Sequence, residues 1–317
     1  MQHAPPRLPE RRRGHRRHPD RASLPGDPGQ RREPPGLRGH RRRGDPRIHA
    51  GALRVLRGGL ALAVAGIPQF DAVIADLQGR LDAVAEPATK AWFENYLKHA
   101  IGYRGVKSPV VTRIVGEWRR ERELGRLPVG EQLGLARSLI EETLAEDKFA
   151  GILYMQRYLV RRVEPERLLE VAEGLFAGGA FFDWSTSDWF SVRVLGPLLR
   201  RGGSGVAERI AGWRVAGSLW QRRAAIVPFR AVVRDEAYHA LIEETIAALA
   251  GERERFIQTG IGWVVSDMSK AHPEVAAALV ERHFDDLSAE VVRRHTRYLP
   301  GHEGYRERKR GVGGSPA

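Results

Sequence analysis

The chain has 317 residues and contains no cysteine. This absence excludes disulfide bonds, thiolate nucleophiles and cysteine-ligated zinc sites, and it fits a reducing compartment. Apolar residues almost never alternate with period two, which argues against a protein built of β-strands. Long apolar runs are also missing. The apolar run at residues 58–67 is too short to span a bilayer. We therefore expect a soluble, cytoplasmic protein.

Positive charge is abundant but unevenly distributed. The formal net charge is +13, yet residues 1–57 alone hold 16 arginines, no lysine and 5 acidic residues. The rest of the chain has 36 basic and 34 acidic residues and is almost neutral. A folded part of this composition must concentrate its positive charge locally if it is to bind phosphates.

Residues 1–66 are rich in Arg, Pro and Gly and poor in large apolar side chains. Such a segment cannot bury enough surface to offset the entropy lost on ordering, so we expect it to be disordered. Two interpretations remain open. The segment is either a polybasic arm that attracts phosphates, or an upstream extension from a mis-assigned start with no selected role.

From about Pro68 the sequence changes to amphipathic helices with short breaks. Apolar residues follow helical spacing in 70–77 and 133–144. Pro109, Pro165 and Pro273 stand where helices should begin. Residues with aromatic and charged character recur at about 40 positions around Trp184, Arg223 and Trp263, a period typical of HEAT-type helical pairs. The sequence therefore predicts an all-α fold, and the spacing is consistent with a solenoid of HEAT-like repeats whose second helices line one concave surface.

Three short blocks combine tryptophan with charged residues: 183–190, 220–226 and 256–263. If the first block opens a helix, Trp184 and Asp188 lie one turn apart on the same face. Each block also has an ordinary explanation. A tryptophan in a helical array is more often part of the core, and the arginines at 222 and 223 could be a solvated face. The residues alone indicate a helical repeat protein with a possible interaction surface.

The order and spacing of these blocks resemble the AlkD-like family of DNA alkylation repair enzymes. The similar elements are Trp-x-x-x-Asp at 184–188, Trp-x-x-Arg-x-Ala at 220–225 and Phe-Ile-Gln-x-x-Ile-Gly-Trp at 256–263. Upstream, 96–98 and 105–109 resemble the family's Tyr-x-Lys and Gly-Ile-Lys-x-Pro elements, and 269–273 is also similar. The resemblance extends from about residue 68 to 299, and it implies that the concave face of the solenoid is basic. It divides the chain into the extension 1–66, a glycosylase domain 67–300 and a flexible basic tail 301–317.

The resemblance implies a role for single residues. Asp188 corresponds to the catalytic carboxylate, Trp184 and Trp263 to the aromatic pair around the lesion, and Arg223 to a DNA-contacting arginine. Further candidates for phosphate contacts are Lys98, Lys107, Arg193, Arg222 and Lys270. This chain departs from the family's usual residues on both sides of Trp184 and at Arg222. These departures bear on lesion preference.

The expected function is a monofunctional DNA glycosylase that excises 3-methyladenine and 7-methylguanine from duplex DNA in base excision repair. It is expected to act as a monomer near the nucleoid, without a cofactor or a metal. His283, Asp285 and Asp286 form the best local cluster for a metal, but their spacing fits no helical metal pair. Two alternatives remain: a repeat protein that binds nucleic acid without cleaving it, and a protein-interaction scaffold with an apolar or mixed concave face.

Overall fold

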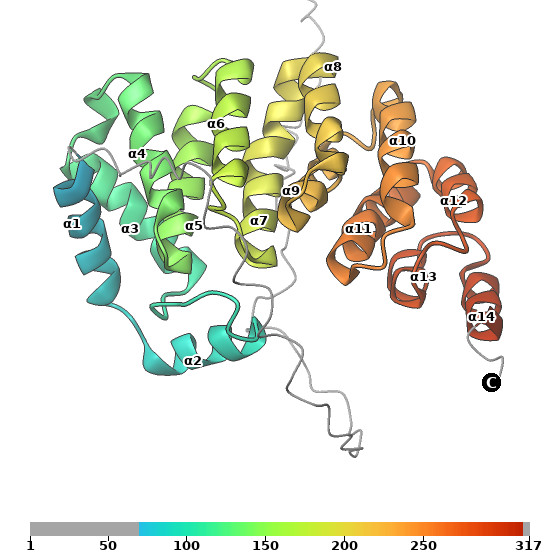
Figure 1. Ribbon diagram of the computed structural model, residues 1–317. Coiled ribbons are helices and arrows are strands. Elements are labelled where there is room, and N and C mark those ends of the chain that lie inside the picture. Colours follow the sequence, from blue (N-terminus) through green and yellow to red (C-terminus); the bar gives the residue numbers. More distant parts are fainter. Residues whose placement is uncertain (1–69, 313–317) are drawn as a thin grey trace, which may run out of the picture. The chain divides into compact units, whose positions relative to one another are not determined.

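The computed structural model describes residues 70–312, and Figure 1 shows these residues as an array of helices. No strand occurs in that range. The prediction of an all-α helical repeat solenoid is confirmed. The proposed extension 1–66 and the short apolar run 58–67 lie outside the described residues.

The helices form two rows (Figure 1), and each helix of the second row packs against the next one of that row. The first row consists of α1 (Asp71–Asp82), α4 (Val129–Glu141), α6 (Pro165–Ala177), α8 (Gly196–Gly212), α10 (His239–Ala250), α12 (Pro273–Arg282) and α14 (His302–Val312). The second row consists of α3 (Ser108–Glu121), α5 (Ala145–Tyr154), α7 (Trp184–Phe190), α9 (Leu219–Ala224), α11 (Arg255–Ala271) and α13 (Ala289–His295). The separate helix α2 (Pro87–Tyr96) lies between α1 and α3 in the sequence.

Short helical turns extend several of these helices. Two are π-helices, η3 (Met155–Leu159) after α5 and η4 (Ser191–Leu195) after α7. The others are the 3-10 turns η2 (Leu124–Arg126), η5 (Trp213–Val215), η6 (Val227–Ala231) and η7 (Glu236–Tyr238). Trp184, Arg223 and Trp263 fall on α7, α9 and α11, so the 40-residue spacing marks three successive helices of the second row.

Local sequence signals explain where the helices begin. Pro109, Pro165 and Pro273 stand in the first turns of α3, α6 and α12, as predicted. Proline suits this place because the amide hydrogen that it lacks would have no partner within the helix. Asp183 and Ser288 cap α7 and α13 by accepting hydrogen bonds from backbone amides of the first turn.

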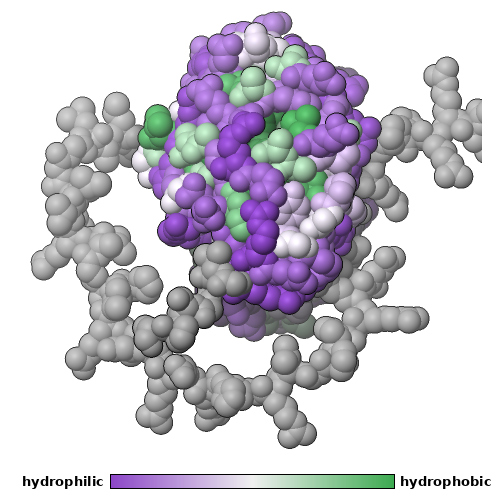
Figure 2. All heavy atoms as spheres, turned by 90° about the vertical axis from the view of Figure 1, so that its right-hand side faces the viewer, coloured by the Kyte–Doolittle hydropathy of each residue, from purple (hydrophilic) through white to green (hydrophobic). Residues whose placement is uncertain are grey.

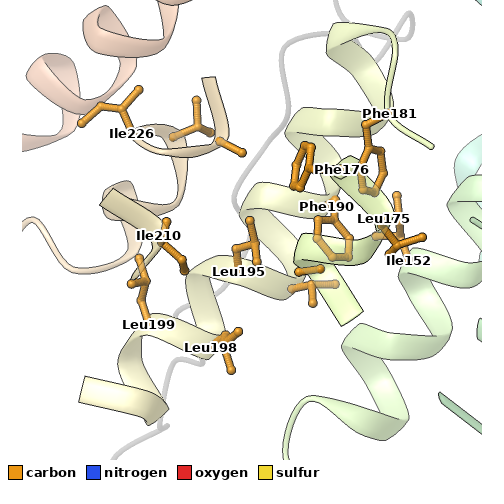
Figure 3. Packing of buried hydrophobic residues seen from close by; sticks show 14 of the residues in the cluster. Ile152, Leu175, Phe176, Phe181, Phe190, Leu195, Leu198, Leu199, Ile210 and Ile226 are labelled. Atoms are coloured by element: carbon orange, nitrogen blue, oxygen red, sulfur yellow. The ribbon is translucent and has the colours of Figure 1, made fainter. Parts of the chain in front are cut away.

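The core runs continuously from one helical pair to the next. Phe176, Phe181 and Phe190 meet between α6 and α7. The ring centroid of Phe181 lies 4.8 Å from that of Phe176 and 4.8 Å from that of Phe190. Figure 3 shows Leu195, Leu198 and other aliphatic side chains carrying the same core onward through α8. Each helical pair is therefore stabilised mainly by its neighbours. No helix between residues 70 and 312 is long and apolar enough to cross a membrane.

The C-terminal end differs from the prediction of a flexible tail from residue 301, because α14 covers most of that segment. Tyr305 is buried against Phe284, and Arg308 pairs with Glu281 at 2.7 Å. The guanidinium of Arg308 also lies 4.0 Å from the centre of the Phe284 ring. Figure 2 turns this end of the array toward the viewer and shows a mainly hydrophilic surface with hydrophobic residues between. Tyr305 and Arg308 thus help to dock a highly charged helix, and Lys309 adds hydrogen bonds to the carbonyl oxygens of Phe284 and Asp285.

Candidate active site

The capping of α7 sets the position of Asp188. The Asp183 carboxylate accepts hydrogen bonds from the backbone amides of Ser185 at 2.7 Å and Thr186 at 3.1 Å, so the helix begins at Trp184. Asp188 follows one turn after Trp184, as the sequence predicts. Its side chain is almost completely buried, with 2% of the residue exposed.

Asp188 forms a bidentate ion pair with Arg223 of α9. Arg223 donates from Nε to Oδ1 at 2.7 Å and from Nη2 to Oδ2 at 2.9 Å. Burial raises the pKa of the Asp188 carboxyl above its ordinary value of 3.8, and the charge and hydrogen bonds of Arg223 oppose that rise. Parallel donation to both oxygens is the geometry of guanidinium with an ionised carboxylate.

Arg223 also joins α9 to α11. Its Nη1 donates to the carbonyl oxygen of Phe256 and to Thr259 Oγ1, the latter at 3.1 Å. A methyl group at Gly260 would lie 3.2 Å from Nη1, so this glycine leaves room for the guanidinium. The arginine is 2% exposed. Arg223 is thus a buried connection between three helices.

Trp263 lies beside two guanidinium groups. Its ring centre is 5.2 Å from Cζ of Arg223 and 4.7 Å from Cζ of Arg230 on η6. Arg230 is held in place by Asp267 at 2.7 Å. The sequence interpretation missed Arg230, which lies on η6 after the break that ends α9 at Ala224. Its position extends the cationic contact over the aromatic ring.

On the other side, Trp184 joins a group of aromatic side chains from α2. The Trp184 and Tyr96 rings meet edge to face, with centroids 5.6 Å apart. Tyr96 stacks on Trp92 at 5.2 Å with the ring planes nearly parallel. Trp92 and Tyr96 are 43% and 47% exposed, which is unusual for residues of their size. Trp184, one helical turn before Asp188, thus belongs to a partly exposed aromatic surface together with Trp92 and Tyr96.

The loop of residues 103–106 fixes α2 to the second row. Glu146, at the start of α5, accepts hydrogen bonds from the backbone amides of Arg104 at 2.9 Å, Gly105 at 2.8 Å and Val106 at 2.9 Å. The hydroxyl groups of Tyr103 and Ser185 lie 3.4 Å apart. Sequence patterns gave no sign of this anchor, because a glutamate in a first helical turn is ordinary.

Replacing Gly105 by alanine should lower the free energy of unfolding by about 1–3 kcal/mol, because the position has a left-handed backbone. Gly105 has φ of 107°, and an added Cβ would lie 2.4 Å from the backbone oxygen of Glu86. Urea unfolding followed by tryptophan fluorescence measures the change. Gly79→Ala in α1 is the matched control, with open space around it, and it should stabilise by about 0.5–1 kcal/mol. Equal effects of the two substitutions would contradict the assignment of the anchor.

The five candidates for phosphate contacts divide into two groups. Lys107 pairs with Glu86 at 3.4 Å, Arg222 with Glu252 at 3.0 Å and Lys270 with Asp267 at 2.9 Å. Lys98 and Arg193 pair with no carboxylate between residues 70 and 312. Lys98 is exposed and has a left-handed backbone with φ of 56°. Arg193 belongs to η4, which directly continues the helix of Asp188.

Two further features of the described residues concern metal ligands and the buried Lys148. No group of three or more His, Asp or Glu residues between 70 and 312 is arranged to hold a metal ion. Lys148 of α5, the helix that packs on α7, is 1% exposed, and its Nζ donates to the carbonyl oxygens of Ile140 and Ala180. Burial lowers its pKa to about 8. The two hydrogen bonds hold this amine between the end of α4 and the segment that precedes α7.

Comparison with known proteins supports the assignment suggested by this geometry. The family model described as DNA alkylation repair enzyme matches residues 77–299. A solved structure described as a predicted DNA alkylation repair enzyme from Enterococcus faecalis has the same fold. Its TM-score is 0.59 at 20% identity, and the match covers 68% of this chain and 96% of that one. No curated protein matches the sequence. The chain belongs to the DNA alkylation repair enzyme family, and its role lies in DNA alkylation repair.

Proposed function

We propose that the protein is a monofunctional DNA glycosylase acting on cationic alkylated purines in duplex DNA. Its substrates are lesions of the 3-methyladenine and 7-methylguanine type, and the reaction hydrolyses the N-glycosidic bond as the first step of base excision repair. One observation carries the proposal. A buried carboxylate, Asp188, lies one turn from Trp184 and is held by Arg223, whose guanidinium contacts the ring of Trp263.

This arrangement matches what the reaction requires. Hydrolysis of most glycosidic bonds needs a general acid for the leaving group and a second carboxylate. A purine alkylated on a ring nitrogen already carries a positive charge, so it leaves without being protonated. What remains is to stabilise an oxocarbenium-like sugar and to orient a water molecule, and one carboxylate can do both.

The expected size of the electrostatic effect is large enough. A carboxylate ~4 Å from the developing cation contributes on the order of 4 kcal/mol at an effective dielectric constant near 20. That energy corresponds to roughly a thousandfold in rate. The faces of Trp184 and Trp263 add ~0.5–2 kcal/mol each by attracting the cation. The same quadrupole favours charged lesions over neutral ones.

A second candidate is a member of the family that binds DNA without cleaving it. The specific observation in its favour is the bidentate pair, because both Asp188 oxygens accept from Arg223 and the carboxylate is buried. In that case Asp188 would only orient Arg223 and join the helices. The reaction itself distinguishes the two candidates.

The test is release of free base from a duplex that contains one 7-methylguanine. The glycosylase should release 7-methylguanine and leave an abasic strand that breaks only on later treatment with alkali, since a monofunctional glycosylase forms no Schiff base with the sugar. The same duplex with guanine at that position is the control and should stay intact. Tight binding to the duplex without any base release would support the binding protein instead.

A further inference from the structure

Two π-helical turns occur at equivalent places in successive second-row helices. η3 follows α5 and η4 follows α7, each has five residues, and each carries an arginine at its third position. These arginines are Arg157 and Arg193. π-Helical turns are rare, and they are frequent at functional sites. The two turns also contact each other, so they bring the two guanidinium groups into one neighbourhood.

Neither arginine has an anionic partner in the described part of the chain. Arg193 donates from Nη1 to Gln156 Oε1 at 2.9 Å, and its Cζ lies 4.2 Å from the ring centre of Trp189. Its Nε is buried without a hydrogen-bond partner among residues 70–312. Arg157 is exposed and forms no ion pair within that range. By contrast, Arg222 and Arg230 of the same row are both paired with carboxylates.

The two positive charges also act on each other. Burial, and then the charge of Arg157, lower the pKa of Arg193. Like charges at short range are unfavourable unless an anion lies between or beside them. A buried guanidinium nitrogen without an acceptor is likewise costly until a partner arrives. An anion beside the two groups would offset both costs, and planar guanidinium groups suit the oxygens of a phosphate.

We propose that Arg157 and Arg193 together bind a phosphodiester of the DNA backbone. This inference rests on the proposed function, since it takes duplex DNA as the ligand. The helix of Asp188 continues directly into η4. A phosphate held there fixes the DNA backbone at a set distance from the carboxylate. Contact with a phosphate carries no sequence information, so the site positions DNA without selecting a sequence.

The experiment measures binding of an unmodified duplex over a range of salt concentrations. Each phosphate contact adds about 0.9 to the negative slope of log affinity against log salt. Arg157→Gln and Arg193→Gln should each weaken binding at low salt and reduce the magnitude of that slope by about 0.9. Two duplexes of different sequence should give the same reduction. Because Arg157 is exposed, its variant should fold normally, and it keeps the test valid if the Arg193 variant is destabilised.

Arg167→Gln is the matched control, with the same change of charge on α6 of the first row. Arg167 is exposed and pairs with Glu170. The Arg167→Gln variant should have the wild-type slope of log affinity against log salt. If Arg157→Gln and Arg193→Gln have that same slope, the inference is overturned. A second arm adds inorganic phosphate alone at constant ionic strength and follows thermal unfolding. If phosphate raises the unfolding temperature of the wild type but not of Arg157→Gln, and the salt slope for DNA is unchanged in that variant, the site binds free phosphate. That result also overturns the inference.

Failure of the inference and failure of the proposed function give different results. Wild-type protein that binds duplex DNA and releases 7-methylguanine, but shows unaltered slopes in the variants, contradicts the arginine pair alone. Wild-type protein that binds DNA without releasing base contradicts only the glycosylase. Absence of any duplex binding by the wild type overturns both.

Discussion

Asp188→Asn should reduce the rate of 7-methylguanine release by about two to three powers of ten, because it removes the charge and keeps the shape. The amide oxygen can still accept one hydrogen bond from Arg223, but the amide nitrogen cannot accept the second. Circular dichroism therefore measures the folded fraction of the variant before its rate is compared with that of the wild type. Single-turnover release under saturating protein measures the chemical step separately from binding. Duplex affinity should change by no more than about threefold, since the loss concerns an interaction made mainly in the transition state.

The pH dependence of the same reaction provides a second readout. Burial raises the pKa of Asp188 above 3.8, and only the ionised form stabilises a cationic sugar. The enzymatic rate should therefore fall as the pH falls through that raised pKa and level off above it. The residual rate of Asp188→Asn should lack this dependence once release without enzyme is subtracted.

Asp285→Asn is the control for these measurements, because Asp285 is an exposed aspartate after α12, remote in sequence from the site. It should leave both the rate and the pH profile unchanged. An Asp188→Asn protein that is folded, binds DNA and releases base at the wild-type rate would show that the carboxylate does not take part in catalysis.

Arg223→Met should lower the free energy of unfolding by about 3–5 kcal/mol, because it leaves the buried Asp188 without its partner. Both oxygens of the carboxylate lose their hydrogen-bond donors, and the links to Phe256 and Thr259 are lost as well. Urea unfolding, with tryptophan fluorescence and circular dichroism compared, measures the change.

A double-mutant cycle identifies the cause of that loss. Asp188→Asn combined with Arg223→Met should be more stable than the sum of the two single effects predicts, by about 1–3 kcal/mol, because no charge remains buried. Arg222→Met is the neighbouring control. Its ion pair with Glu252 is partly exposed, so the cost should be about 1 kcal/mol or less. Strict additivity in the cycle would mean that the two charges do not interact as the geometry indicates.

The sequence predicted those features that depend on local pattern. Prolines marked three helix starts, and apolar spacing indicated a helical array. Trp184 and Asp188 share a face because four residues make about one turn of any helix. The assignment of Arg223 and Trp263 to the same site needed the resemblance to a family, because a spacing of 35 or 75 residues carries no physical meaning until the helices are stacked.

Other features were out of reach for physical reasons. The π-helical turns depend on shifted backbone hydrogen bonds, and the segments MQRYL and SVRVL read as ordinary helix. The anchoring role of Glu146 is decided by a loop some 40 residues earlier in the sequence. The docking of α14 by Tyr305 and Arg308 was missed because charge density suggested a solvated tail. In each case tertiary contacts outweighed local preference.

The complete burial of α5 has a consequence for how the array unfolds. All ten residues of this helix are buried, including Glu146, Asp147 and Lys148. Stacked repeats usually open from their ends, one pair at a time. Here the 103–106 loop fastens the N-terminal helices to α5, while Tyr103 reaches Ser185 on the following pair. Unfolding from the N-terminal end must therefore expose Glu146, Asp147 and Lys148 together. We expect the N-terminal half to open as one cooperative unit and the C-terminal helical pairs to open in smaller steps.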